Sequence, residues 1–300
     1  MLTGIHIILT YTCVFECDHC FLHCSPYAEG VFTIDRIEET LNEAVKIKTV
    51  EWIFFEGGEA TLYYPLLLES VRRASLKGFK VGLVTNAYGA NSYNDALLWL
   101  KPLKEAGLTE ISLSNDAFHF GDKTENQATI AASAANDLGM HISSIKIELP
   151  IASQNFTHDG EKGAPVIGGG VKFRGRAVEK LLSGLPVKPW NDFRRCPYEN
   201  LENPSRVHVD PYGHVHICQG VSMGNMFEVS LSKIVREYDA QLHPFCGPLI
   251  KGGPSELSRA LRIIHEEEYV DECHFCYSIR KRAMDRFPAY LAPKQVYGVK

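Results

Sequence analysis

The 300-residue sequence contains no apolar run long enough to span a membrane and no excess of basic residues. Lys and Arg number 31 against 36 Asp and Glu, giving a net charge of −5. We therefore expect neither a nucleic-acid nor an anionic-membrane partner. The opening MLTGIHIILTYTC lacks the basic segment and cleavage site of a secretory signal peptide. These absences predict a cytoplasmic protein.

Nine cysteines occur in the chain, several of them in tight groups. In a reducing compartment such groups are typical of metal ligation or catalysis and less typical of disulfides. The length and the 45% hydrophobic content fit either one large α/β domain or a domain of about 200 residues with a smaller one beside it.

Short apolar runs alternate with amphipathic stretches over residues 1–180, which predicts parallel βαβ units. The predicted strands are 5–11, 50–56, 80–86, 110–116, 144–152 and 171–175. The predicted helices are 33–50, 65–78, 93–107, 128–140 and 177–184, the first with Thr33 as its N-cap.

Polar motifs follow the first four predicted strands directly. They are the cysteines from Cys13 onward, residues 56–59, Asn86, and residues 114–116. The carboxyl ends of parallel strands form the active-site edge in α/β sheets and barrels. We therefore expect these four motifs to converge on one site.

The composition changes near residue 186, after which the chain is rich in proline and turns. Residues 206–220 predict a β-hairpin that turns at Asp210–Gly213. We place a second, smaller module at 187–300.

Cys13, Cys17 and Cys20 have the spacing C-x3-C-x2-C in a loop. Three thiolates can hold three irons of a cubane cluster and leave the fourth iron free for an external ligand, whereas closed ferredoxin clusters use four cysteines. A closed zinc site that adds Cys24 is an alternative on spacing alone.

With this spacing after the first strand, the sequence resembles the radical S-adenosylmethionine (radical SAM) superfamily over residues 5–180. The resemblance implies a partial (β/α)6 barrel and a [4Fe–4S] cluster on Cys13, Cys17 and Cys20, the catalytic cysteines. It also implies S-adenosylmethionine on the open iron, cleaved reductively to a 5′-deoxyadenosyl radical that abstracts a substrate hydrogen. Such a cluster is oxygen-sensitive, which favours an anaerobic physiology.

Further cofactor-binding residues follow from the same resemblance. Gly57, Gly58 and Glu59 match the GGE segment that meets the methionine amine, Asn86 ends the matching TN pair, and Ser114 and Asp116 resemble the S-x-D element.

The sequence also departs from the family pattern. His19 stands where an aromatic residue often precedes the third cysteine, and Ala60 replaces the proline of GGEP. No arginine shortly follows Asp116, so Lys123, His119 and Lys146 are the candidates for the methionine carboxylate. We interpret Cys24 as a spare thiol, and His19 and His23 as loop residues that bind no metal.

A second set of cysteines lies in the second module: Cys196, Cys218, Cys273 and Cys276. Four thiolates could close around one iron–sulfur cluster or one zinc. The region resembles the SPASM and shorter twitch modules of radical SAM enzymes, which implies one auxiliary [4Fe–4S] cluster with four cysteine ligands. We expect Cys246 to be a buried core residue. Arg176, in a GRA stretch, could reach a carboxylate or pair with Glu179.

The sequence thus predicts a radical SAM barrel at 1–186 and a twitch-like module at 187–300. The resemblance implies oxidation or cyclisation of a small molecule, with the auxiliary cluster as electron acceptor and a reductase, flavodoxin or ferredoxin as donor. A chain that begins at its first strand favours a small substrate. The alternatives are a peptide- or protein-modifying enzyme and a non-catalytic iron–sulfur carrier or redox sensor.

Overall fold

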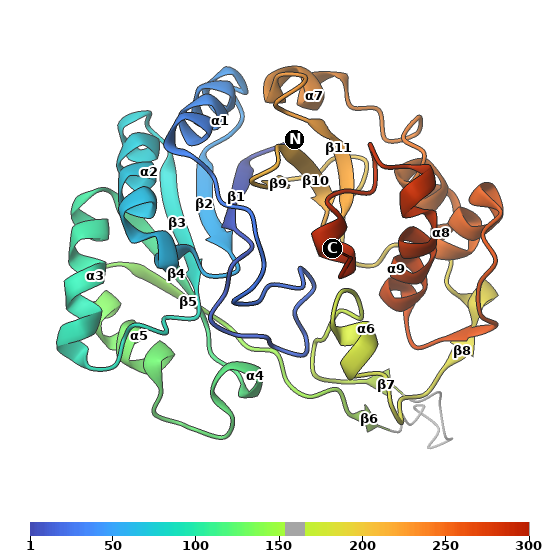
Figure 1. The fold of residues 1–300 in the computed structure, drawn as a ribbon, viewed down its shortest axis with the longest axis horizontal. Coiled ribbons are helices and arrows are strands. Elements are labelled where there is room, and N and C mark those ends of the chain that lie inside the picture. The colour runs from blue at the N-terminus through green and yellow to red at the C-terminus, as the bar shows by residue number, and fades with distance from the viewer. Residues whose placement is uncertain (154–165, 300) are drawn as a thin grey trace, which may run out of the picture.

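The computed structural model describes residues 1–153 and 166–299. Its centre is an eight-stranded sheet with the order β11-β10-β9-β1-β2-β3-β4-β5 (Figure 1). These strands are β1 Gly4–Thr10, β2 Trp52–Gly57, β3 Lys80–Thr85, β4 Leu108–Ser114, β5 His141–Ile145, β9 Arg206–Val209, β10 His214–Cys218 and β11 Val221–Asn225.

Two short strand pairs lie outside this sheet: β6 Ala152–Ser153 with β7 Val166–Ile167, and β8 Lys188–Pro189 with β12 Glu268–Tyr269. The helices are α1 Ile34–Lys46, α2 Tyr64–Leu76, α3 Tyr93–Glu105, α4 Ala117–Phe120, α5 Gln127–Asp137, α6 Ala177–Lys180, α7 Leu231–Glu237, α8 Cys246–Leu261 and α9 Glu272–Ala283. Within the described ranges, no helix is both long and apolar enough to cross a membrane.

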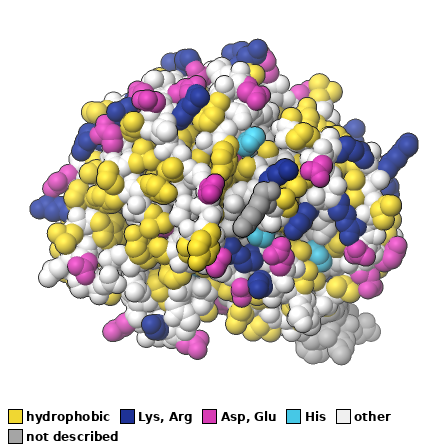
Figure 2. All heavy atoms as spheres, viewed as in Figure 1, with side chains coloured by type: hydrophobic (Ala, Val, Ile, Leu, Met, Phe, Trp, Pro, Cys, Tyr) yellow, Lys and Arg dark blue, Asp and Glu magenta, His cyan; other side chains and the backbone are white. Residues whose placement is uncertain are grey.

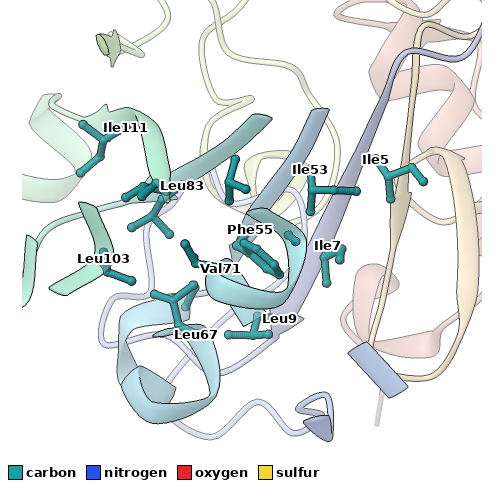
Figure 3. Close-up of a cluster of buried hydrophobic side chains, with 14 of the residues drawn as sticks. Ile5, Ile7, Leu9, Ile53, Phe55, Leu67, Val71, Leu83, Leu103 and Ile111 are labelled. Carbon is teal, nitrogen blue, oxygen red and sulfur yellow. The ribbon is translucent and has the colours of Figure 1, made fainter. Parts of the chain in front are cut away.

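Helices α1, α2, α3 and α5 cover the outer face of the sheet, as Figure 1 shows. Odd-numbered residues of β1 and β2, such as Ile5, Ile7 and Phe55, are fully buried against these helices (Figure 3). Successive residues of a strand point to opposite faces, so the even-numbered residues face the inner side of the sheet. This alternation gives one face to the core and leaves the other for a site.

Most predicted elements are confirmed within a few residues, including the Thr33 cap, which accepts a hydrogen bond from the Arg36 amide. β1 to β5 pair in parallel as expected. The mixed α/β class with a parallel sheet is therefore confirmed. The fifth strand begins earlier than predicted, at His141, because its first residues are polar and the apolar run that follows lies beyond the ladder with β4.

The predicted sixth strand at 171–175 is wrong. This segment packs against the cysteine loop, where the Arg176 amide donates to the Cys20 carbonyl at 2.9 Å. Gly175 has φ +62°, and a Cβ there would lie 2.5 Å from the Cα of Phe21. Buried Val171 and Phe173 explain the misleading strand-like alternation. The predicted helix that follows is one short turn, α6.

The sixth parallel strand is β9, which pairs with β1. It belongs to the confirmed hairpin β9–β10, whose second strand is antiparallel to the first. The hairpin lies in the segment predicted as a separate module, yet Val207, Val209 and Val215 share the main core. A second core is formed by residues of α8, α9 and the segments packed against them. The boundary at 186/187 stays a prediction, and the sheet continues across it.

Candidate active site

A cavity of about 700 Å³ lies along the inner face of the sheet and reaches the carboxyl ends of its parallel strands. Its volume is within the range of small-molecule sites. The predicted site residues that line it are Cys13, Cys17, Cys20, Gly57, Gly58, Asn86 and Ser114. Figure 2 shows His, Lys and Arg side chains gathered near the middle of the molecule, between the β1–β5 half and the α8–α9 half.

The cysteine loop follows β1 and is held by its own backbone. The Cys13 amide donates to the Ser25 carbonyl at 3.0 Å, and the Cys20 amide donates to the Cys17 carbonyl at 3.0 Å. Burial raises the pKa of Cys13 and of Cys17 to about 12. A bound metal must therefore displace protons from these thiols.

Cys24 is buried beside the three predicted ligands. A hydrogen bond between the Cys20 and Cys24 thiols lowers the pKa of Cys20 to about 6. Cys24 thus supports Cys20 in a way that the sequence did not indicate. Its position in the cavity wall agrees with a thiol next to the ligand set.

Arg176 fastens the cysteine loop. Its guanidinium donates to the carbonyl of Cys17 at 2.8 Å and to the carbonyl of Cys24 at 2.7 Å. The side chain is buried. It forms no ion pair with Glu179, whose described partner is Lys281. The predicted pairing with Glu179 is therefore wrong, because the loop presents two carbonyls to one planar donor. Contact of Arg176 with a carboxylate stays a prediction.

The Gly57-Gly58-Glu59 segment crosses the end of β1 at close range. The Gly58 amide donates to the Thr10 carbonyl at 2.8 Å, and a Cβ on Gly58 would lie 2.2 Å from the Thr12 carbonyl oxygen. Glycine is required here because any side chain would push the segment away from the chain that leads into Cys13.

The Glu59 carboxylate does not line the cavity. It accepts hydrogen bonds from the Thr61 and Thr85 hydroxyls at 2.6 and 2.8 Å, and from the Thr61 and Asn86 amides at 3.0 and 2.8 Å. Burial raises its pKa. Glu59 therefore joins the ends of β2 and β3 and positions Asn86, whose amide group lies 3.7 Å from the Cys13 sulfur.

Asp116 also points away from the cavity and caps α4. Its carboxylate accepts from the Phe118 amide at 3.1 Å, the His119 ring at 2.7 Å and the Ile147 amide at 3.3 Å. Burial alone would raise its pKa, but His119 outweighs burial, so the pKa lies below its usual range.

Among the three candidates for the methionine carboxylate, only His119 lines the cavity. Lys123 and Lys146 line a neighbouring pocket that also contains Asp116. Sequence reasoning missed three cations in the cavity wall: Lys172, Arg174 and Arg206. The first two lie in the segment misread as a strand, so no motif marked them.

The second cysteine set encloses a smaller cavity, lined by Cys196, Cys218, Cys273 and Cys276 together with Arg174 and Arg280. Arg174 donates to the Cys218 sulfur at 2.9 Å. Arg280 is 1% exposed and donates to the Gln219 carbonyl at 2.9 Å. The Nε atoms of both arginines lack a partner among the described residues.

Two buried guanidinium groups require negative charge nearby. Arg174 has Glu199 at 3.8 Å, whereas no carboxylate of the described chain pairs with Arg280. Four metal-bound thiolates would supply that charge, since metal ligation deprotonates cysteine. The donor set therefore fits either an iron–sulfur cluster or zinc. Cys246 is fully buried in the core under α8, as expected.

Residues 7–131 match the sequence model of the Radical SAM superfamily. A tungsten-containing aldehyde ferredoxin oxidoreductase cofactor-modifying protein of Pyrococcus furiosus is 25% identical over 164 residues, which is 51% of this chain and 44% of that protein. The "Putative peptide biosynthesis protein YydG" of Bacillus subtilis is 26% identical over 115 residues, 38% of this chain and 36% of that protein. The matched region thus covers less than half of either relative.

The crystal structure of BtrN in complex with AdoMet and 2-DOIA superposes with a TM-score of 0.55 at 16% identity, covering 84% of this chain and 88% of BtrN. This likeness concerns the fold. The family match runs from β1 through α5, the stretch that carries the three-cysteine loop, Gly57 and Gly58, Asn86 and Ser114. Residues 7–131 therefore carry a radical SAM domain, and that family implies a [4Fe–4S] cluster and S-adenosylmethionine.

Proposed function

We propose that this radical SAM enzyme oxidises a small molecule and that the second cysteine set holds an iron–sulfur cluster that accepts the electron. The proposal rests on the position of Arg174. It lines the large cavity and the four-cysteine cavity, and it donates to Cys218. The place where substrate would bind is thus separated from the second set by one side chain.

Cys13, Cys17 and Cys20 would hold the first cluster, with one iron left for S-adenosylmethionine. When bound, this pair supplies a 5′-deoxyadenosyl radical that removes a hydrogen atom from the substrate. Gly57, Gly58, Asn86 and Ser114 would contact the cofactor, since they line the cavity. Glu59 and Asp116 would act by positioning strand ends and α4.

The cations Lys172, Arg174 and Arg206 would orient a substrate that carries negative or polar groups. Burial, followed by the charge of Arg174, lowers the pKa of Lys172, so an anionic ligand would relieve its desolvation. A low-potential donor such as a flavodoxin or ferredoxin would reduce the first cluster.

Modification of a peptide is the second candidate. It is favoured by the similarity to YydG, whose name assigns that protein to peptide biosynthesis. The similarity to a cofactor-modifying protein favours neither candidate, because the name leaves the size of the modified molecule open.

The test is anaerobic reconstitution with iron and sulfide, followed by metal counting and a dithionite-driven assay for 5′-deoxyadenosine. We compare wild type with the triple variant Cys13→Ala/Cys17→Ala/Cys20→Ala and with Cys273→Ala/Cys276→Ala. Roughly eight irons per chain, with deoxyadenosine lost only in the triple variant, supports the proposal.

Two outcomes contradict it. Roughly four irons with one zinc would leave radical chemistry but remove the internal electron acceptor. Full iron loading without any deoxyadenosine would favour a carrier or sensor. Incubation with metabolite and peptide fractions, with stimulated deoxyadenosine formation as the signal, then separates the two substrate classes.

A further inference from the structure

Three ionisable side chains lie together on the inner face of the sheet and belong to neither cysteine set. They are His6 of β1, Glu56 of β2 and His208 of β9. His6 stands directly opposite His208 in the β1–β9 ladder, and Glu56 stands opposite Ile8, two residues beyond His6. All three line the large cavity. Glu56 belongs to the polar motif at residues 56–59, but the sequence assigned no role to it or to the two histidines.

The Glu56 carboxylate accepts a hydrogen bond from each histidine. His6 Nδ1 lies 2.9 Å from one carboxylate oxygen, and His208 Nδ1 lies 2.7 Å from the other. Burial opposes ionisation of Glu56, but the two histidines outweigh it and hold its pKa well below the usual range. An ionised carboxylate accepts only, so both imidazoles carry their protons on Nδ1.

The two histidines differ at their second ring nitrogen. The Gln219 amide donates to His208 Nε2 at 3.3 Å, which occupies that lone pair. His6 Nε2 has no hydrogen-bond partner among the described residues. The His6 ring is instead held by stacking on Phe54, with ring centroids 4.9 Å apart and an angle of 15° between the planes. His6 therefore presents a free, basic lone pair to the cavity.

The charges around His6 favour this role. Glu56 is the single carboxylate among the described cavity-lining residues, and it supports the imidazole from behind. A carboxylate behind an imidazole fixes its tautomer and stabilises the imidazolium formed when it takes a proton. His208 and Arg206 are the other titratable or charged groups near this pair.

We propose that His6 Nε2 is the proton acceptor for the oxidation, that Glu56 is its positioning residue, and that the substrate carries a hydroxyl on the carbon that is oxidised. The inference rests on the proposed oxidation, which must remove one hydrogen atom, one proton and one electron. The C–H hydrogen leaves as an atom to the 5′-deoxyadenosyl radical. The O–H proton goes to His6 Nε2, the electron goes to the iron–sulfur centre of the second cysteine set, and the C–O bond becomes C=O.

The first experiment needs no substrate. Cluster-loaded enzyme is treated anaerobically with diethyl pyrocarbonate, which acylates neutral imidazole, and modified histidines are quantified by peptide mapping. We expect His6, whose side chain is 18% exposed, to react more slowly than His141, which is 75% exposed. His208 should react at least about 10-fold more slowly than His6 because both its nitrogens are engaged. Protection of His6 together with His208 would overturn the proposal.

The same samples test whether His6, Glu56 and His208 instead bind a metal ion. His6, Glu56 and His208 could also ligate a metal ion, since their ligand atoms lie within 4.8 Å of one another. A non-iron metal that is present in the loaded wild type and absent from Glu56→Gln would overturn the proposal, because His6 would then be a ligand.

The second experiment uses the compound that stimulates deoxyadenosine formation in the screen above. For His6→Ala we expect carbonyl product to fall about 100-fold or more while deoxyadenosine still forms, with partial rescue by added imidazole. His141→Ala is the matched control and should retain wild-type product. Equal ratios of product to deoxyadenosine in His6→Ala and wild type would overturn the proposal, as would a substrate without a hydroxyl at the oxidised carbon.

Glu56→Gln tests positioning. A Gln amide can donate to His6 Nδ1 and so leave a proton on Nε2, so the ratio of carbonyl product to deoxyadenosine should fall at least about 10-fold, with partial recovery in Glu56→Asp. A merely structural Glu56 would lower product and deoxyadenosine together and leave their ratio unchanged. Failure of the proposed function itself looks different: wild type would then give no carbonyl product, whatever the state of His6.

Discussion

The two cysteine sets, which we propose as metal sites, are built in opposite ways. The first set lies on one loop after β1 and forms part of the wall of a large cavity. The second set draws four thiols from three separate segments and closes around a small cavity. An open site leaves room for a cofactor at the metal, whereas four enclosing thiolates leave none.

The two cysteine sets also differ in how buried arginines contact them. Within the described ranges the buried arginines are Arg174, Arg176 and Arg280, and each lies beside a cysteine set. Arg176 binds backbone carbonyls of the first loop and leaves the sulfurs alone. Arg174 binds a sulfur of the second set directly. Arg176 therefore fixes the shape of the first loop, whereas Arg174 places positive charge beside the second set.

The largest effect should come from replacing predicted ligands of each set in turn. Cys17→Ala should lower deoxyadenosine formation about 1,000-fold or more, because three thiolates are the minimum for the open cluster. Cys276→Ala should leave deoxyadenosine within a few-fold of wild type while removing the second metal. Iron counting and the deoxyadenosine assay check both. Equal loss of deoxyadenosine in both variants would mean that the sets are interdependent.

Replacing Arg176 should be the next largest effect. Arg176→Lys keeps the charge, but one ammonium group cannot span the Cys17 and Cys24 carbonyls as the planar guanidinium does. Each charge-assisted bond contributes about 1.5–3 kcal/mol, so we expect the first cluster to be lost at least about 10-fold more readily on chelator treatment.

The control for that experiment is Arg282→Lys, which changes an exposed arginine bound to Glu266. It should not alter cluster retention, because exposed ion pairs contribute little. Wild-type retention in Arg176→Lys would show that the loop is held by its own backbone bonds alone.

Much of this architecture could be predicted from sequence, and the failures have physical causes. The βαβ order, the Thr33 cap and the hairpin at Asp210–Gly213 follow from local pattern. Residues 171–175 misled because Val171 and Phe173 are buried in a small apolar cluster with Ala177 and Val270, without a strand ladder. Convergence of the strand-end motifs on one cavity was predictable, since parallel strands fix it.

The roles of particular side chains were less accessible. A GGE motif does not tell that Glu59 turns back to Thr61, Thr85 and Asn86, because these contacts depend on the ends of β2 and β3. Likewise, His6 and His208 meet only because β9 pairs with β1 across about 200 residues of chain, and no periodicity within either strand encodes that pairing.

Replacing Arg174, the buried cation beside the second cysteine set, should have a smaller effect. Arg174→Gln should lower the reduction potential of its cluster, because a buried cation that donates to a sulfur stabilises the more negative, reduced state. Loss of a charge-assisted bond worth about 1.5–3 kcal/mol corresponds to roughly 65–130 mV for one electron.

Arg195→Gln is the matched control. Arg195 lines the same cavity, but its side chain is 80% exposed. Solvent screens an exposed charge, so the potential should stay within a few tens of millivolts of wild type. Redox titration followed by electron paramagnetic resonance measures both variants. An equal shift in both would mean that the potential responds to net charge and not to the buried bond.

The smallest effects should come from the two thiols outside the ligand sets. Cys24→Ala removes the hydrogen bond to Cys20 but no predicted ligand, so iron should stay at the wild-type level while the first cluster's potential falls slightly. Cys246→Ala removes a fully buried thiol from the core under α8 and should lower stability by about 1 kcal/mol without changing iron content. Iron counting with chemical denaturation distinguishes these effects. Iron loss in Cys24→Ala would make the first set a four-thiolate site, and the contrast between an open and a closed centre would then fail.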